Sequence, residues 1–90
     1  MNRSAAFIIG PTLTVSSPRD GETLKKPVVL LRGTAERIAE LTVNGRKIFT
    51  DEEGVFSDSL LLLPGYNIIT VVAKDRFDRE EKKTLHVILK

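Results

Sequence analysis

The sequence predicts an all-β sandwich of about seven strands that follows an extended N-terminal arm. Turn-forming residues recur at nearly even intervals between short stretches rich in Val, Ile, Leu and Thr, as expected for strands joined by turns. The 90 residues contain four Phe, one Tyr and no Trp, so an aliphatic core is expected, and this composition suits β packing. The turn signals lie at residues 17–21, 44–45, 51–54, 64–65 and 75–78.

Each predicted strand lies between two of these signals. Clean alternation turns Leu13 and Val15 inward, and Asn44-Gly45 between two short strands predicts a type I′ hairpin, which needs positive φ at both positions. Residues 35–41 have good helix propensity, but they make barely two turns between strands, so we interpret them as a loop or one short turn. The strands are expected at residues 13–15, 28–35, 40–44, 46–50, 55–62, 67–74 and 82–89.

The domain organisation follows from this strand order. Residues 1–11 form the predicted arm or linker and residues 12–90 the sandwich, because ninety residues suffice for one domain. The spacing favours a sandwich over alternating strands and helices, and no internal repeat is visible.

A pattern of apolar and turn residues resembles bacterial immunoglobulin-like domains, and is most similar to the group related to the B domain of glucodextranase. The resemblance covers residues 12–89 and implies a non-catalytic module, not an enzyme, of an exported protein that is extracellular or on the cell surface. One departure is Phe77-Asp78, where the family usually has Gly-Asn, and it leaves Phe77 at an exposed tip. The pattern reads Leu13-x-Val15-x-Ser17-Pro18-x-Asp20-Gly21, Val29-x-Leu31-x-Gly33-x-Ala35, Leu41-x-Val43-Asn44-Gly45, Asp51-x-x-Gly54-x-Phe56 and Pro64-Gly65-x-Asn67-x-Ile69-x-Val71-x-Ala73-x-Asp75.

The resemblance also assigns the inward face of each strand, and strand periodicity then turns a second set of aliphatic side chains outward. Two interpretations of these outward side chains stay open. They are either ordinary surface aliphatics that favour β structure, or they form patches that another subunit, a neighbouring domain or the arm covers. The expected core is Val29, Leu31, Leu41, Val43, Phe56, Leu60, Leu62, Ile69, Val71, Ala73, Leu85, Val87 and Leu89. The outward residues, our candidate interface, are Leu30, Leu61, Ile68, Val72 and Ile88.

The N-terminal arm contains the apolar run Ala5-Ala6-Phe7-Ile8-Ile9. This run is too short for a signal peptide core or for the about 20 residues of a transmembrane helix. No membrane span is therefore expected within the chain, and an anchor in a longer parent protein stays open. The arm is either a loose terminus or a strand that adds to a sheet edge of another copy, and Phe7, Ile8 and Ile9 join the candidate interface.

Charge and motif content point away from catalysis. The net charge is only +2 and the basic residues form no stripe, so nucleic-acid binding is not expected. There is no cysteine, and His86 has no nucleophile or acid at motif spacing. The acidic groups of residues 51–53 and 75–78 match no calcium loop and are interpreted as turn-forming acids. We expect no catalytic residue, metal or cofactor.

Two functional hypotheses remain. The first is a structural module whose partner is a protein, either itself or neighbouring domains, and which assembles through the arm and outer strand faces. The second is a carbohydrate-binding or other ligand-binding accessory domain of a larger surface enzyme. Sugar platforms generally use exposed aromatic rings, and Tyr66 is the only Trp or Tyr in the chain, which favours the first hypothesis.

Overall fold

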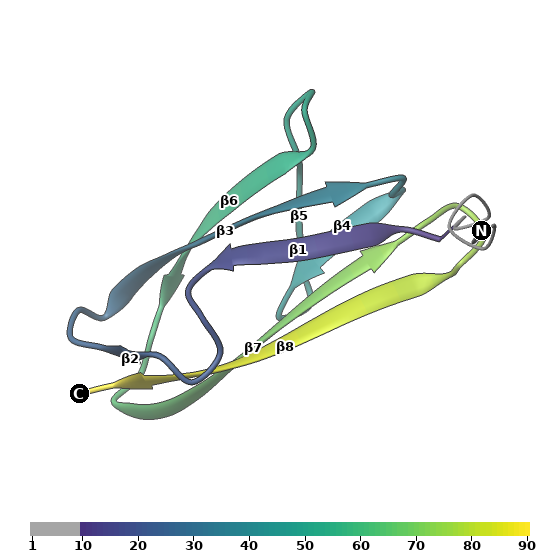
Figure 1. Cartoon of the computed structure of the whole chain (residues 1–90). Helices are drawn as coiled ribbons and strands as arrows, with labels where there is room; N and C mark the ends of the chain where they lie inside the picture. The colour runs from purple at the N-terminus through teal and green to yellow at the C-terminus, as the bar shows by residue number, and fades with distance from the viewer. Residues whose placement is uncertain (1–9) are drawn as a thin grey trace, which may run out of the picture.

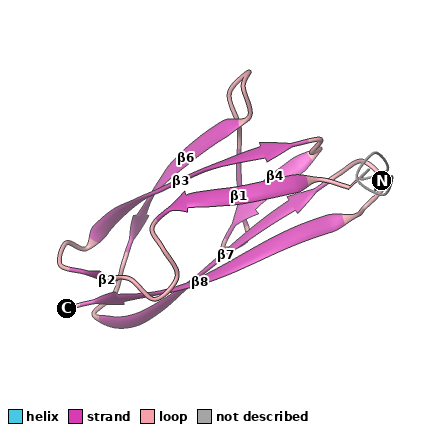
Figure 2. Ribbon diagram, viewed as in Figure 1, coloured by secondary structure: helices cyan, strands magenta, loops and turns pink. Residues whose placement is uncertain are grey.

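The computed structural model describes residues 10–90 and contains two β-sheets packed face to face (Figure 1). The predicted all-β sandwich is confirmed, and Figure 2 shows strands and loops throughout this part of the chain. Residues 10–90 include no helix long and apolar enough to cross a membrane. The strands are β1 (Thr12–Ser17), β2 (Thr23–Leu24), β3 (Val28–Glu36), β4 (Glu40–Val43), β5 (Arg46–Ile48), β6 (Val55–Leu61), β7 (Gly65–Lys74) and β8 (Glu80–Leu89).

One sheet has three strands in the order β1-β3-β6, and the other has five in the order β2-β8-β7-β4-β5. All pairs are antiparallel except β2 with β8. β2 was not predicted from the sequence, because a strand of two residues is too short to show any periodicity. The other seven strands correspond to the seven predicted ones, with ends that differ by a few residues.

The core lies between the sheets and is built by alternation along each strand. In β3 exposed and buried residues alternate over all nine positions, as expected when one face is buried and the other meets solvent. Twelve of the thirteen expected core residues are buried. Leu89 is only half-buried and packs against the margin of the core, because its neighbour there is the two-residue strand β2. Leu13, Ala35 and Ile48 are also buried in the core.

The turns follow the predicted chemistry. Asn44 and Gly45 have φ of 51° and 83°, so both central residues of this hairpin adopt the positive φ that a type I′ turn requires. Of the segment with helical propensity, only residues 37–39 form a turn, in which Arg37 has φ of 58°; the prediction of a loop over residues 35–41 was too long, because β3 extends to Glu36 and β4 begins at Glu40. Asp78 has φ of 64° in the β7–β8 turn, a conformation that Asp tolerates better than most residues.

A bidentate ion pair joins an edge strand of one sheet to an edge strand of the other. Asp58 lies on the inward side of edge strand β6, and Arg46 of β5 reaches it with Nη2 at 2.5 Å from Oδ2 and Nη1 at 3.2 Å from Oδ1. The planar guanidinium therefore covers a carboxylate that would otherwise lie unpaired beside the core.

The chain enters and leaves the sandwich at opposite ends (Figure 1). Gly10 lies beside the β3–β4 turn, since the Arg37 Nε donates a hydrogen bond to the Gly10 carbonyl at 3.1 Å. The Ala39 N–H donates to the Lys74 carbonyl, which brings the β7–β8 turn to the same place. We call this region, made of Gly10 and the turns at residues 37–39 and 75–79, the N-terminal end.

Candidate interaction surfaces

The first candidate surface is the outer face of the three-stranded sheet. Leu30 and Leu61 are both exposed there, and Leu61 is 75% accessible. In the register of β3 with β6, Val28 lies opposite Leu61 and Leu30 opposite Ser59, so Leu30 and Leu61 are diagonal neighbours within reach of each other. Val28, which is not among the predicted interface residues, is also exposed and belongs to this patch.

The second candidate surface is the outer face of the five-stranded sheet. Ile68 is exposed, whereas Val72 and Ile88 are only half-buried in the surface of the sheet. Tyr66 of β7 lies directly opposite Ile88 of β8 and is 81% accessible. Tyr66, Ile68 and Ile88 therefore share one end of this face, while Val72 lies further along β7 between Thr42 and Lys82.

The predicted interface residues are thus divided between two opposite outer faces. Leu30 and Leu61 belong to one sheet, and Ile68, Val72 and Ile88 belong to the other. Period-two patterning shows which residues point away from the core, but not which sheet a strand joins. Phe7, Ile8 and Ile9 lie outside the described residues.

His86 of β8 contacts the loop between β1 and β2. The His86 backbone N–H donates to Asp20 Oδ1 at 2.7 Å, and the ring Nδ1 lies 3.1 Å from the same oxygen. The backbone N–H first, and the ring second, lower the pKa of Asp20 below its ordinary value. The Gly21 N–H donates to the His86 carbonyl, so these contacts fasten the β1–β2 loop to β8.

The acidic turns use their carboxylates to order their own backbones. Asp51 Oδ1 accepts from the N–H groups of Glu53 and Val55, both at 2.9 Å. Asp75 Oδ1 accepts from the N–H groups of Phe77 and Arg79 at 2.8 and 2.9 Å. These are turn-forming acids, and residues 10–90 contain no cluster of His, Cys, Asp or Glu arranged to hold a metal ion.

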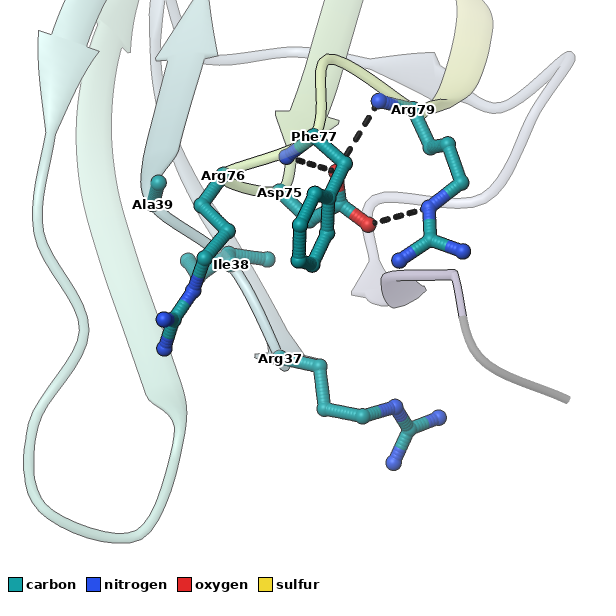
Figure 3. A pocket seen from close by; sticks show the side chains of 7 residues that line it. All are labelled: Arg37, Ile38, Ala39, Asp75, Arg76, Phe77 and Arg79. Carbon is teal, nitrogen blue, oxygen red and sulfur yellow. Dashed lines mark hydrogen bonds and ion pairs between the residues drawn. The ribbon is translucent and has the colours of Figure 1, made fainter.

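A groove of about 370 Å³ opens at the N-terminal end between the β3–β4 and β7–β8 turns (Figure 3). Three arginines surround Phe77, which is 69% accessible, and the Arg79 and Arg76 guanidinium carbons lie 5.0 and 6.0 Å from its ring centroid. We call this site the basic groove; it is lined by Arg37, Ile38, Ala39, Asp75, Arg76, Phe77 and Arg79.

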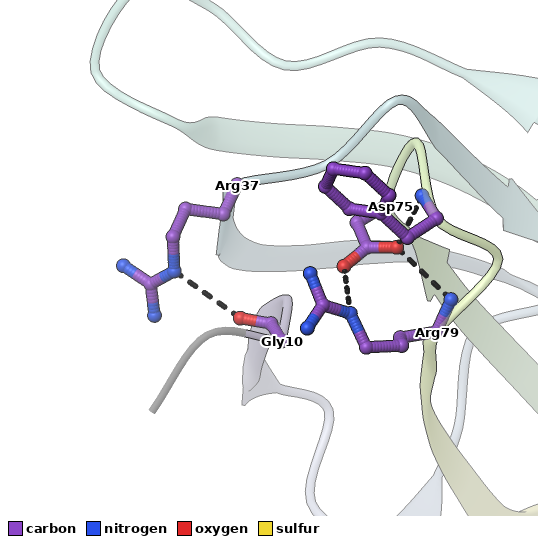
Figure 4. Close-up of polar contacts among 5 residues, drawn as sticks. Gly10, Arg37, Asp75 and Arg79 are labelled. Atoms are coloured by element: carbon purple, nitrogen blue, oxygen red, sulfur yellow. Dashed lines mark hydrogen bonds and ion pairs between the residues drawn. The ribbon is translucent and has the colours of Figure 1, made fainter. Parts of the chain in front are cut away.

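Asp75 is the structural centre of the basic groove (Figure 4). Besides the two backbone bonds, its Oδ2 accepts from the Arg79 Nε at 2.7 Å. Burial alone would raise the pKa of Asp75, but the hydrogen bonds from Arg79 and Phe77 together hold that pKa below its ordinary value. The Asp75 carboxylate therefore stabilises the β7–β8 hairpin.

We predict that Asp75→Asn lowers stability at neutral pH, because it removes the charge that Arg79 pairs with. A carboxyl whose pKa is lowered by folding stabilises the protein above its unfolded pKa of about 3.9, and this contribution is lost as the pH falls through the lower folded pKa. The difference in Tm between wild type and variant should therefore shrink as the pH falls below about 4. Thermal unfolding followed by circular dichroism at several pH values measures it, with Asp78→Asn as the charge-matched control. A difference that is constant with pH contradicts this role for Asp75.

Comparison with known proteins agrees with the architecture. The family model for glucodextranase, domain B, matches residues 11–90. Among solved structures, the chain is similar to the fibronectin(III)-like modules of Clostridium thermocellum CbhA, with a TM-score of 0.62 and 19% sequence identity over 88% of this chain and 96% of that one. No curated protein matches. The structural likeness shows a fibronectin(III)-like and immunoglobulin-like sandwich, and the family match shows that the chain belongs to the glucodextranase domain B family.

Proposed function

We propose that this chain is a non-catalytic structural or interaction module of an exported or cell-surface protein, and that it self-associates through its apolar arm and outer strand faces. The observation that carries the proposal is the exposure of large aliphatic side chains on both outer sheet faces, where sandwiches ordinarily carry polar residues. Family membership supports a module within a larger protein, since the family is named as domain B of glucodextranase.

The three-stranded sheet also offers main chain for a further strand. Within residues 10–90, β1 and β6 each pair on one side only. Residues 5–9 are apolar and free of Pro and charge, so they suit addition to such an edge in a second copy. Backbone hydrogen bonds would supply affinity, and alternate side chains would pack against the sheet.

The carbohydrate-binding alternative has weaker support. The outer face of the five-stranded sheet carries one aromatic ring, that of Tyr66, with aliphatic neighbours. A glycan array signal that is lost on Tyr66→Ala would favour this alternative over a protein partner.

Light scattering of the full chain, compared with a chain beginning at Pro11, tests the self-association. We expect the full chain to exceed the mass of a monomer as concentration rises, and the shortened chain to associate less. Monomers in both samples at every concentration would show that the arm and outer faces do not drive assembly.

A further inference from the structure

The N-terminal end carries a positive surface, and most of its guanidinium donors have no partner within residues 10–90. Arg37 and Arg79 each use only Nε, on Gly10 and Asp75 respectively. Within residues 10–90, the terminal nitrogens of these two guanidinium groups have no hydrogen-bond or ion-pair partner. None of the three guanidinium nitrogens of Arg76 has such a partner there either. Asp75 pairs with one of the three arginines and the exposed Asp78 lies in the same turn, so this end keeps an excess of one positive charge.

A negative surface lies on the same end of the sandwich. We call residues 51–54, between β5 and β6, the acidic loop. Glu52 and Glu53 are exposed and have no ion-pair partner within the described residues, while Asp51 is occupied in ordering the loop. The Gly54 carbonyl accepts from the Ala35 N–H at 2.8 Å, which fixes the acidic loop beside the last residues of β3, just before Arg37.

Exposed aromatic rings accompany both charged surfaces. Phe77 belongs to the basic groove, and Phe49 precedes the acidic loop with 79% of its surface accessible. Phe49 also lines a smaller hollow that shares Ile38 and Ala39 with the basic groove, so the surface around Phe49, just before the acidic loop, adjoins the groove. Apolar rings beside complementary charges are typical of protein contacts rather than of a purely solvated end.

We propose that two copies of this chain dock through their N-terminal ends in a two-fold arrangement, with the acidic loop of each copy in the basic groove of the other. Two-fold contacts require that both complementary surfaces lie on the same region of one molecule, and this end meets that condition. Guanidinium groups bind carboxylates through paired hydrogen bonds, so Glu52 and Glu53 suit the open nitrogens of the groove. The inference rests on the proposed self-association and names one of its contacts.

The small area of the N-terminal end limits the expected affinity of the dimer. The molecule measures 46 × 29 × 21 Å, and its cross-section at either end is smaller than the about 800 Å² per partner of a stable interface. The dimer is therefore weak, and its exposed ion pairs are screened at high ionic strength, where the Debye length falls to about 3 Å in 1 M salt.

Charge reversal tests the docking. Sedimentation velocity at low ionic strength should show at least about tenfold weaker association for Arg37→Glu/Arg76→Glu, and equally for Glu52→Lys/Glu53→Lys, because like charges then face each other twice in each dimer. An equimolar mixture of the two variants should recover association, since both contacts in the mixed dimer again join opposite charges. Recovery also shows that neither variant has simply unfolded.

The control is Lys25→Glu/Lys26→Glu, which makes the same change in net charge as the arginine reversal, but in the exposed turn between β2 and β3, and should associate as wild type does. Association that survives both groove and loop reversals, or a mixture that stays monomeric, overturns the inference. The chain beginning at Pro11 separates this contact from the proposed function. If this shortened chain dimerises and charge reversal weakens its dimer, the contact between N-terminal ends forms without the arm. If only the arm drives association, shortening abolishes association and charge reversal of the full chain leaves it unchanged.

Discussion

Phe56→Ala is expected to lower the free energy of unfolding by about 3–5 kcal/mol, the range for truncating a buried phenylalanine. Among residues 10–90, Phe56 is the largest fully buried side chain, with 1% of its surface accessible, and its ring packs against Gly33 of β3. A domain of this kind is stable by only about 5–15 kcal/mol, so the variant should lose a large part of that stability.

Urea denaturation followed by circular dichroism measures the change, and Phe49→Ala is the matched control. Phe49 is exposed, so its truncation should change the free energy of unfolding by no more than about 0.5 kcal/mol. A loss below about 1 kcal/mol for Phe56→Ala would contradict the position of this ring in the core.

Gly33→Ala should destabilise the sandwich by about 1–3 kcal/mol or more, because one added methyl group has no room. Gly33 is buried in β3, the central strand of its sheet, opposite Val15 of β1 and Phe56 of β6. A Cβ at this position would overlap the Thr14 carbonyl oxygen and would lie 2.6 Å from Cζ of Phe56. The ring of Phe56 therefore occupies the place that a side chain of residue 33 would need.

The same denaturation experiment measures this effect, with Gly10→Ala as control, since a Cβ at Gly10 would meet nothing within 4 Å. Adding Phe56→Leu to Gly33→Ala should cost less than the two single changes together, because the smaller side chain relieves the overlap with the ring, although the overlap with the Thr14 carbonyl oxygen remains. Strict additivity would mean that Gly33 and Phe56 do not compete for the same space.

The core could be predicted from the sequence because alternation and turn residues are local signals. Val29, Leu31 and Val71 are buried where a period of two places them, and Asn44-Gly45 adopts the conformation that its residue types favour. The resemblance puts Leu89 in the core, whereas Leu89 is partly buried and packs against the core beside the two-residue strand β2, whose short length no local pattern indicates.

The candidate surfaces could be predicted only in part. Exposure of Leu30, Leu61 and Ile68 follows from strand patterning, but their division between two sheets depends on strand order. The basic groove had no sequence signal, since Arg37 and Arg76 come from turns that are far apart in the chain and meet only through the pairing of β4 with β7. The contact of Arg46 with Asp58 likewise joins two sheets and has no local pattern.

Self-association is the central claim, and sedimentation velocity of the full chain over a wide range of concentrations at low ionic strength tests it most directly. We predict a sedimentation coefficient that rises with concentration from that of a single chain towards that of a dimer or larger assembly. A coefficient that stays at the single-chain value throughout would contradict the claim.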